Sequence, residues 1–293
     1  MSKFYSPLRY PGGKNCIFPF MAELIHENEL VGCSYAEPFA GGAGLALHLL
    51  MAGFVSEIHL NDFDHSIYSF WNSVLNRGEE FCGWIANVKI DMETWEWAKN
   101  VHSNMNNVDD FELAKATFFL NRANVSGIIM GGPIGGPTQK GKYKINARFN
   151  REDLIQRIKE ISIFKNQIFL YEMDGIDFLK QINRRRKKYF IYIDPPYVKK
   201  GADLYMNFFK KEDHENLLKQ IQKTKKLWLV SYDANDLIIN LYKQYNCLSY
   251  SLSQCTSNRM GNEILIYPDS IVIESSICKL KSPQRLLSNV CNR

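Results

Sequence analysis

The segment from residue 34 to residue 62 constrains the fold most, because two short apolar runs flank a glycine-rich turn in it. Residues 34–39 are expected to form a strand, Ala40-Gly-Gly-Ala-Gly44 a turn, and the apolar run 45–51 a helix. A second strand is expected at 57–60, and Asn61-Asp62 follows it. A strand, a glycine turn, a helix, a strand and an acidic residue form the outline of a βαβ nucleotide-binding unit.

The rest of the chain predicts an α/β domain that is interrupted by an insertion. Further strands are expected at 167–171, 189–193, 227–231 and 263–267, with helices at 176–182 and 212–224. This alternation predicts a largely parallel sheet. Residues 72–165 differ, with tryptophans, helix-like stretches and a loop rich in glycine and proline. We therefore expect a discontinuous catalytic domain at 1–71 and 166–275, a mostly separate and mainly helical insertion at 72–165, and a mobile basic tail at 276–293.

The tetrapeptide Asp194-Pro195-Pro196-Tyr197 directly follows the apolar strand at 189–193. Ligands bind at the carboxyl ends of the strands in an open parallel sheet, so these residues lie where chemistry is expected. The prolines stiffen the backbone and lack amide donors. Asp194 and the carbonyl of Pro195 can accept both N–H groups of an amine on a planar ring, while Tyr197 stacks on its face. The bland interpretation is a strand that ends in a stiff turn, but the motif predicts a site for an exocyclic amine.

The glycine-rich turn narrows the choice of cofactor. Residues 39–44 match neither the GxGxxG spacing of dinucleotide sites nor the Walker spacing of ATPases. Asp62 follows Gly41 and Gly42 by about 20 residues, the spacing expected of a carboxylate that binds ribose hydroxyls. This combination predicts an adenosine cofactor without phosphates, and S-adenosylmethionine is the candidate. The turn Tyr10-Pro-Gly-Gly-Lys14 could close over it or could be a surface turn.

Composition excludes several classes of protein. The chain of 293 residues has 45% hydrophobic and 23% charged residues, as in ordinary globular proteins, and a formal net charge of +5. The seven cysteines show no CxxC pair or Cys/His spacing, so we expect reduced thiols and no metal site. No apolar run is long enough for a membrane helix, and no secretory signal is evident, which predicts a cytoplasmic protein.

The motifs occur in the order found in the Dam-like (α-group, D12 class) DNA adenine-N6 methyltransferases, and the chain resembles that family over nearly its whole length. The resemblance rests on Tyr10-Pro-Gly-Gly-Lys14, Glu37-Pro-Phe-Ala-Gly-Gly-Ala-Gly44, Asn61-Asp62, Phe118-Phe-Leu-Asn121-Arg122, Asp177-Phe178, Asp194-Pro-Pro-Tyr197, Ser231-Tyr232 and Arg259 to Ile266. It implies a Rossmann-like sheet with an antiparallel strand near its end, and a target-recognition role for the insertion. It also implies transfer of a methyl group from S-adenosylmethionine to adenine N6.

From the motifs and the resemblance we expect two sets of site residues. The cofactor-binding set is Tyr10, Lys14, Glu37, Phe39, Gly41, Gly42, Asp62, Asp177 and Asp194, and the catalytic set is Asp194, Pro195, Pro196 and Tyr197.

Binding of duplex DNA requires phosphate contacts, and the target base must leave the stack to be reached. The expected nucleic-acid-binding residues are Arg122, Lys140, Lys142, Lys144 and Arg148, most of which lie in a stretch free of acids. A second basic cluster, 184–188, could contact phosphates or could be a charged connection. His214, between acidic residues, is expected to be solvated.

Other interpretations remain open at this point. The same cofactor site could methylate RNA adenine or a protein amide, or the chain could be a catalytically silent DNA-binding relative. Protein-glutamine enzymes usually carry Asn at the first motif position, where this chain has Asp194. A cognate restriction endonuclease would be a functional rather than a physical partner. The enzyme would be nucleoid-associated in a prokaryote or encoded by a phage.

Overall fold

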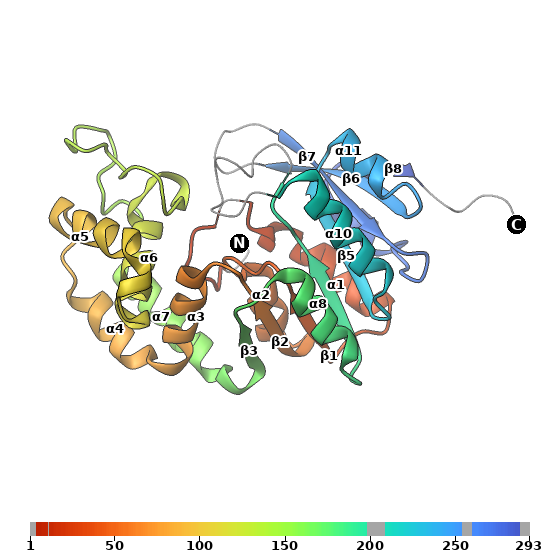
Figure 1. Ribbon diagram of the computed structural model, residues 1–293, viewed down its shortest axis with the longest axis horizontal. Coiled ribbons are helices and arrows are strands. Elements are labelled where there is room, and N and C mark those ends of the chain that lie inside the picture. The colour runs from red at the N-terminus through yellow and green to blue at the C-terminus, as the bar shows by residue number, and fades with distance from the viewer. Residues whose placement is uncertain (1–3, 11, 198–208, 254–259, 288–293) are drawn as a thin grey trace, which may run out of the picture.

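A computed structural model describes residues 4–10, 12–197, 209–253 and 260–287 (Figure 1). Pro11, Arg259 and the end of the predicted tail, 288–293, lie outside the described residues. Within the described ranges, no helix combines the length and the apolar character that a membrane crossing requires.

Eight strands of the described chain form one sheet. They are β1 (Cys33–Glu37), β2 (Val55–Asn61), β3 (Ile168–Tyr171), β4 (Tyr189–Ile193), β5 (Leu227–Asp233), β6 (Asn246–Ser253), β7 (Met260–Tyr267) and β8 (Gln284–Leu287). Their order is β3-β2-β1-β4-β5-β7-β6-β8. The first five are parallel, and β7, β6 and β8 add in antiparallel pairs. The predicted α/β class and the antiparallel strand are confirmed.

Helices cover both faces of the sheet and form the insertion. The α-helices are α1 (Phe18–Glu27), α2 (Gly44–Met51), α3 (His65–Asn76), α4 (Gly78–Asn87), α5 (Met92–Ser103), α6 (Asp110–Ala123), α7 (Arg151–Ile163), α8 (Gly175–Arg184), α10 (Lys211–Gln222) and α11 (Asp236–Leu241). Short 3-10 helices are η1 (Lys14–Ile17), η2 (Met105–Asn107), η3 (Val125–Gly127), η4 (Lys165–Gln167) and η5 (Ser276–Lys279).

The central strand β4 shows why the sheet is buried on both sides. Phe190 and Tyr192 belong to the hydrophobic cluster that includes α1 and α2, whereas Tyr189, Ile191 and Ile193 belong to the cluster of α8, α10 and α11. Successive side chains of a strand point to opposite faces, so both faces of β4 need apolar residues. This explains the continuous apolar run before Asp194.

The insertion is joined to the catalytic domain more closely than we predicted. Helix α3 contacts β3 on one side and α4, α6 and α7 on the other, and Figure 1 shows these helices grouped beside the sheet. Phe70 of α3 stacks on Phe118 of α6 at 5.8 Å and meets Phe81 of α4 edge to face. The resulting core is continuous with the α1–α2 face of the sheet, so the insertion shares a hydrophobic core with the rest of the chain.

Three further differences concern the C-terminal half. Strands β6 and β8 were not predicted, and β8 places residues 284–287 of the predicted mobile tail in the sheet. A strand as short as β8 carries little pattern, and its pairing with β6 is decided by tertiary contact. His214 is 1% exposed, not solvated, because its Nδ1 lies 2.9 Å from the Tyr232 hydroxyl beneath α10.

Asn121 of α6 fixes the N-terminal segment against the insertion. Its Oδ1 accepts a hydrogen bond from the amide of Arg9 at 2.7 Å, and its Nδ2 donates to the carbonyls of Arg9 and Gly127, both at 2.9 Å. Gly127 has a φ of +78°, and a Cβ there would lie 2.1 Å from the Arg9 carbonyl oxygen. The close approach of Arg9 to the insertion therefore depends on both Asn121 and Gly127. It directs the following residues Tyr10 and Lys14 toward the sheet.

We expect Asn121→Ala to lower the free energy of unfolding by about 2–4 kcal/mol, because it leaves buried backbone groups without partners. Urea unfolding followed by circular dichroism measures the change. Asn76→Ala, at an exposed position of α3, is the matched control and should change the value by less than about 0.5 kcal/mol. Equal effects of the two substitutions would contradict the role given to Asn121.

Candidate functional site

The candidate site lies at the carboxyl edge of the parallel strands, where Asn61 holds the connecting loops together. Asn61 is fully buried, and its Nδ2 donates to the carbonyls of Pro38, after β1, and Met173, after β3, both at 2.9 Å. The amide of Met173 donates back to Asn61 Oδ1 at 3.1 Å. One side chain at the end of β2 thus fixes the loops that follow three neighbouring strands.

Asp62, which the spacing predicted as a ligand of ribose hydroxyls, braces the glycine-rich turn. Its Oδ2 accepts a hydrogen bond from the amide of Gly41 at 2.8 Å, and its Oδ1 accepts one from the amide of Asp64 at 3.0 Å. Trp71 Nε1 donates to the carbonyl of Gly41 at 2.9 Å. Burial, with a contribution from Asp64, raises the pKa of Asp62 to about 7. The carboxyl group is therefore held in a fixed orientation and keeps lone pairs for a ligand hydroxyl.

Tyr10 lies directly on the glycine turn. A Cβ on Gly41 would come within 2.6 Å of the Tyr10 ring, and a Cβ on Gly42 within 2.7 Å of the Tyr10 Cβ. Gly41 also has a φ of +46°, in the left-handed region that favours glycine. The structure therefore brings together the N-terminal motif and the glycine motif, which are about 30 residues apart in the chain.

Lys14 connects the N-terminal motif to Asp194. Its Nζ donates to Asp194 Oδ2 at 2.8 Å, to the Tyr197 hydroxyl at 2.7 Å and to the carbonyl of Gly12 at 2.8 Å. Ser231 of β5 donates its hydroxyl to Asp194 Oδ1 at 2.7 Å. Lys14 is buried, whereas the Asp194 side chain is 23% exposed, so the ammonium fixes a half-buried carboxylate at the end of β4.

Tyr197 points inward, which differs from the predicted stacking position. The residue is 8% exposed, and its hydroxyl lies 3.2 Å from Asp194 Oδ1 and 3.1 Å from Glu263 Oε1. Its single proton can be donated to one of these oxygens at a time. Pro195 is buried and Pro196 half-buried, in keeping with a stiff turn. Stacking of Tyr197 on a base requires its side chain to leave this cluster.

Buried polar residues behind Asp194 were not in the predicted site set. Tyr192 donates its hydroxyl to Ser231 at 2.8 Å, and Tyr250 of β6 donates to Glu263 Oε2 at 2.9 Å. The available sequence signal was weak: Glu263 is a lone carboxylate at the start of the apolar run EILIY. A charged residue in an apolar strand indicates a functional site only when the strand is known to lie in the middle of the sheet, where a charge is rarely buried.

Glu37 at the end of β1 is buried and accepts a hydrogen bond from the Tyr35 hydroxyl at 2.9 Å. Burial is the main cause that raises the pKa of Glu37 to about 8, although the Tyr35 hydroxyl opposes the rise.

Phe39 and Asp177, the remaining predicted cofactor residues, lie at the border of the site. The Phe39 ring packs on Gly175 at the start of α8, where a Cβ would come within 2.6 Å of it. Asp177, in the first turn of α8, is exposed and pairs with Lys180 at 2.7 Å. The structure thus places Asp177 near the same edge without joining it to the buried cluster.

The basic loop of the insertion starts beside the site, because Gly127 contacts Arg9 next to Tyr10. Lys140, Lys142, Lys144 and Arg148 are all exposed. Gln139 organises the loop: its Nε2 donates to the carbonyls of Ile134 and Gly136, and its Oε1 accepts from the amide of Ile145. Figure 1 shows the loop extending from the helical group. It is an ordered loop with four exposed cationic side chains, of which Lys144 donates to the carbonyl of Gln139.

Arg122 differs from the expectation of a DNA contact. Its guanidinium donates from Nε to the carbonyl of Arg148 at 2.7 Å, from a second nitrogen to the same carbonyl, and weakly to Pro7 at 3.4 Å. Burial lowers the pKa of Arg122 to about 9. These contacts tie the basic loop to the N-terminal segment, so the structure gives Arg122 a bracing role.

The second basic cluster, 184–188, precedes β4 and therefore lies at the opposite edge of the sheet from Asp194. Lys187 pairs with Glu57 at 2.8 Å, and Lys188 donates to the carbonyl of Glu29 at 2.6 Å. This placement favours a charged connection over a phosphate contact for a base bound at Asp194.

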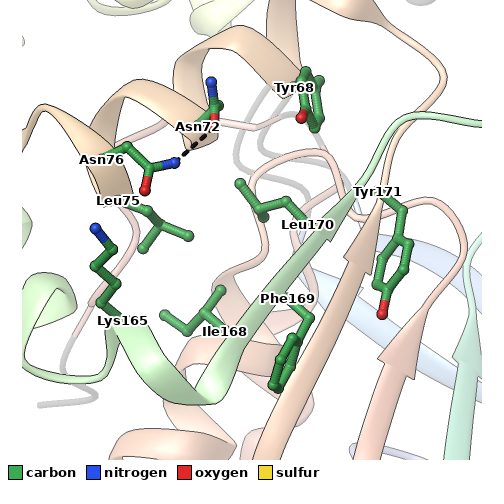
Figure 2. Close-up of a pocket in the computed structure, with 9 residues that line it drawn as sticks. All are labelled: Tyr68, Asn72, Leu75, Asn76, Lys165, Ile168, Phe169, Leu170 and Tyr171. Atoms are coloured by element: carbon green, nitrogen blue, oxygen red, sulfur yellow. Dashed lines mark hydrogen bonds between the residues drawn. The ribbon is translucent and has the colours of Figure 1, made fainter.

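A separate cavity of about 410 Å³ lies between α3 and the edge strand β3. Tyr68, Asn72 and Asn76 line it from the helix, and Figure 2 shows Ile168 and Leu170 on the side of the strand that faces this helix. It contains none of the predicted site residues, so it is not the site described above. In the described part of the chain, no group of three His, Cys, Asp or Glu residues is arranged to hold a metal ion.

The sheet order and the polar residues at its carboxyl edge define an α/β enzyme of Rossmann-like architecture. The chain belongs to the D12 class of N6 adenine-specific DNA methyltransferases, whose sequence profile matches residues 10–253. It is thus an S-adenosylmethionine-dependent enzyme that methylates adenine N6 in DNA. Of the substrates considered from the sequence, the family selects DNA.

Two relatives extend over most of the chain. The type II methyltransferase M.CviBI of Paramecium bursaria Chlorella virus NC1A is 26% identical over 250 residues, which are 79% of this chain and 86% of the relative. The type II methyltransferase M1.LlaDCHI of Lactococcus lactis subsp. cremoris is 23% identical over 255 residues, covering 81% and 84%. M. capricolum TrmK, solved with S-adenosylhomocysteine, is similar at a TM-score of 0.35 and 8% identity, covering 84% of this chain and 68% of that one.

The raised pKa of Glu37 predicts a pH dependence of stability. Its folded-state pKa, about 8, lies above the ordinary value of 4.5, so the folded protein binds the extra proton. This contribution is present below the ordinary pKa and is lost as the pH rises through about 8. We expect Glu37→Gln to reduce the decline in the free energy of unfolding between about pH 5 and pH 8.

Urea unfolding at several pH values measures this decline. The control is Glu57→Gln, because the pKa of Glu57 is about 2, held down chiefly by its hydrogen bonds from Lys187 and Ser34 against the effect of burial. That variant should keep the wild-type slope above pH 5. A Glu37→Gln protein with the wild-type slope would show that Glu37 is ionised in the folded state.

Proposed function

We propose that the site methylates an adenine extruded from duplex DNA, with Asp194 and the carbonyl of Pro195 accepting the two N–H groups of the target amine. One observation carries the proposal: Asp194 is fixed at the end of β4 by Ser231 and Lys14, beside the turn braced by Asp62. An acceptor held in this way favours a tetrahedral nitrogen whose lone pair points away from the ring. It therefore stabilises the reacting form of the amine.

The residues present fit S-adenosylmethionine. Asp62 offers acceptor lone pairs for the ribose hydroxyls, and Glu37 adds a buried acceptor. Tyr10 lies on Gly41 and Gly42, where its ring would cover a bound adenosine. We assign the cofactor-binding role to these residues together with Lys14, Phe39, Asp177 and Asp194. When bound, the cofactor would supply a methyl group that is activated by its sulfonium. The lone pair of adenine N6 would form the new C–N bond, and the electrons of the broken C–S bond would remain on sulfur.

The chain's own part in the reaction is alignment. Asp194 and the carbonyl of Pro195 orient the amine, and holding reactants in a near-attack geometry can contribute much of the acceleration. The amine loses one proton, for which Asp194 is the acceptor in place. Tyr197 stacks on the extruded base once it swings out of the buried cluster, which offsets part of the cost of unstacking, at about 1–3 kcal/mol per base.

DNA is held by the basic loop of the insertion. Lys140, Lys142, Lys144 and Arg148 are exposed on a loop that begins beside the N-terminal motif. Their charges fit phosphate contacts that position the duplex.

The printed names of the relatives as type II methyltransferases support a role beside a cognate restriction endonuclease as functional partner. We place the enzyme in the cytoplasm of a prokaryote, near the nucleoid, or in a phage-infected cell.

We expect Asp194→Ala to lower the rate of methyl transfer by about 10³-fold or more while the fold stays intact, because the substitution removes the acceptor for the amine. Transfer of tritiated methyl groups to unmethylated plasmid DNA, followed by nucleoside analysis, measures the rate and the product. Asp236→Asn, in the first turn of α11, is the control. Full activity of Asp194→Ala, or label that appears in total RNA in place of DNA, would refute the proposed mechanism.

We expect Lys140→Ala/Lys142→Ala to weaken DNA binding and to reduce the slope of log affinity against log salt by about 2, because two phosphate contacts are lost. Fluorescence anisotropy with a labelled duplex at several salt concentrations measures this slope. Arg184→Ala/Arg186→Ala removes equal charge at the opposite edge of the sheet and should leave the slope unchanged. If the two pairs behave alike, the loop does not form the DNA surface.

A further inference from the structure

Lys14 and the target amine compete for Asp194. In this structure Asp194 Oδ2 accepts from the Lys14 ammonium at 2.8 Å, and Oδ1 accepts from Ser231 at 2.7 Å with Tyr197 at 3.2 Å. An incoming amine needs lone pairs on the same carboxylate. It also gains positive charge as it is methylated, and an ammonium beside Asp194 disfavours that charge. The arrangement seen here therefore suits the enzyme before the base arrives.

A base bound at Asp194 would draw on two partners of Lys14. The amine takes Asp194, and Tyr197 must leave the cluster to stack on the ring. A buried ammonium that loses its carboxylate is costly unless another one replaces it. Such a carboxylate is close, because Glu263 Oε2 lies 3.6 Å from Lys14 Nζ. This distance is longer than a good hydrogen bond, so a small movement of Lys14 would complete it.

The sheet fixes Glu263 in this position. Strand β7 lies between β5 and β6, and Glu263 pairs in register with Asp233 and Tyr250. Tyr250 donates its hydroxyl to Glu263 Oε2 at 2.9 Å, and Glu263 is 6% exposed. Burial raises the pKa of Glu263, whereas the Lys14 ammonium lowers it. Approach of Lys14 and ionisation of Glu263 therefore favour each other.

We propose that Glu263 is a positioning residue that takes over the Lys14 ammonium when the target amine binds Asp194. This inference rests on the proposed function of Asp194. Glu263 acts through Lys14 and does not touch the reacting atoms. With Lys14 on Glu263, the Asp194 carboxylate faces the amine without a competing cation.

The first test is Glu263→Gln, which keeps the size of the side chain and removes its charge. Single-turnover methyl transfer at saturating cofactor and DNA should slow by about 10–100-fold, less than the loss from a direct contact with reacting atoms. The dissociation constants of S-adenosylhomocysteine and DNA should change by less than about threefold, since the variant affects a later step. Glu57→Gln, which removes a Lys-paired carboxylate at the opposite edge of the sheet, should keep the wild-type rate.

A double-mutant cycle separates this role from a structural one. In Lys14→Met there is no ammonium to hold, so adding Glu263→Gln should cause little further loss of rate. Losses that multiply would show that Glu263 acts independently of Lys14 and would overturn the proposal. If Glu263→Gln keeps the wild-type rate while Asp194→Ala is inactive, only the role given to Glu263 is overturned. If Asp194→Ala is active, the proposed function itself is refuted.

A crystal structure of the wild-type enzyme with S-adenosylhomocysteine and target DNA gives a second test. This test requires no variant, so it does not depend on whether a variant folds. Lys14 Nζ should lie within about 3.2 Å of Glu263 and beyond hydrogen-bond distance from Asp194. Lys14 still bound to Asp194, with the adenine amine in place, would overturn the proposal.

Discussion

The ion pair between the buried Lys14 and the half-buried Asp194 is the interaction on which the site depends. It connects a segment at the start of the chain to the end of the central strand β4. The buried Lys14 ammonium is stable only when it is paired and hydrogen-bonded, and here Asp194, Tyr197 and the carbonyl of Gly12 supply its contacts, while Ser231 holds the half-buried Asp194. The arrangement requires that the N-terminal segment be held on the sheet, and Asn121 of the insertion does this through Arg9.

The insertion is therefore more than a platform for DNA. Through α3 it shares a hydrophobic core with one face of the sheet, and through Asn121 and Arg122 it braces the N-terminal segment. The same Arg122 binds the carbonyl of Arg148 in the basic loop. The surface that we assign to DNA and the motif that we assign to the cofactor thus depend on one another through backbone contacts. A change in the loop can reach the site without contacting the cofactor.

Much of the fold followed from local pattern. The strands around 34–39 and 189–193, the glycine turn and the acidic Asp62 lie close together in sequence, and apolar runs that end in polar residues are typical of buried parallel strands. Strands β6 and β8 and the buried position of His214 did not follow. A strand of four residues such as β8 and a single polar residue such as His214 carry no period of their own, so segments far away in the chain set their environment. Strand β6 differs, because its sequence NCLSYSLS does alternate between apolar and polar residues.

The order of the motifs along the chain was enough to predict the chemistry and to assign it to Asp194, Tyr197, Lys14, Asp62 and the glycines. Tertiary structure decided which groups meet. The antiparallel strand β7 brings Glu263 within 3.6 Å of Lys14, although the two are about 250 residues apart in the chain. It also turned Arg122 from an expected DNA contact into a brace. The reason is physical, because a buried charge takes its role from the partners that surround it, and those partners come from the fold.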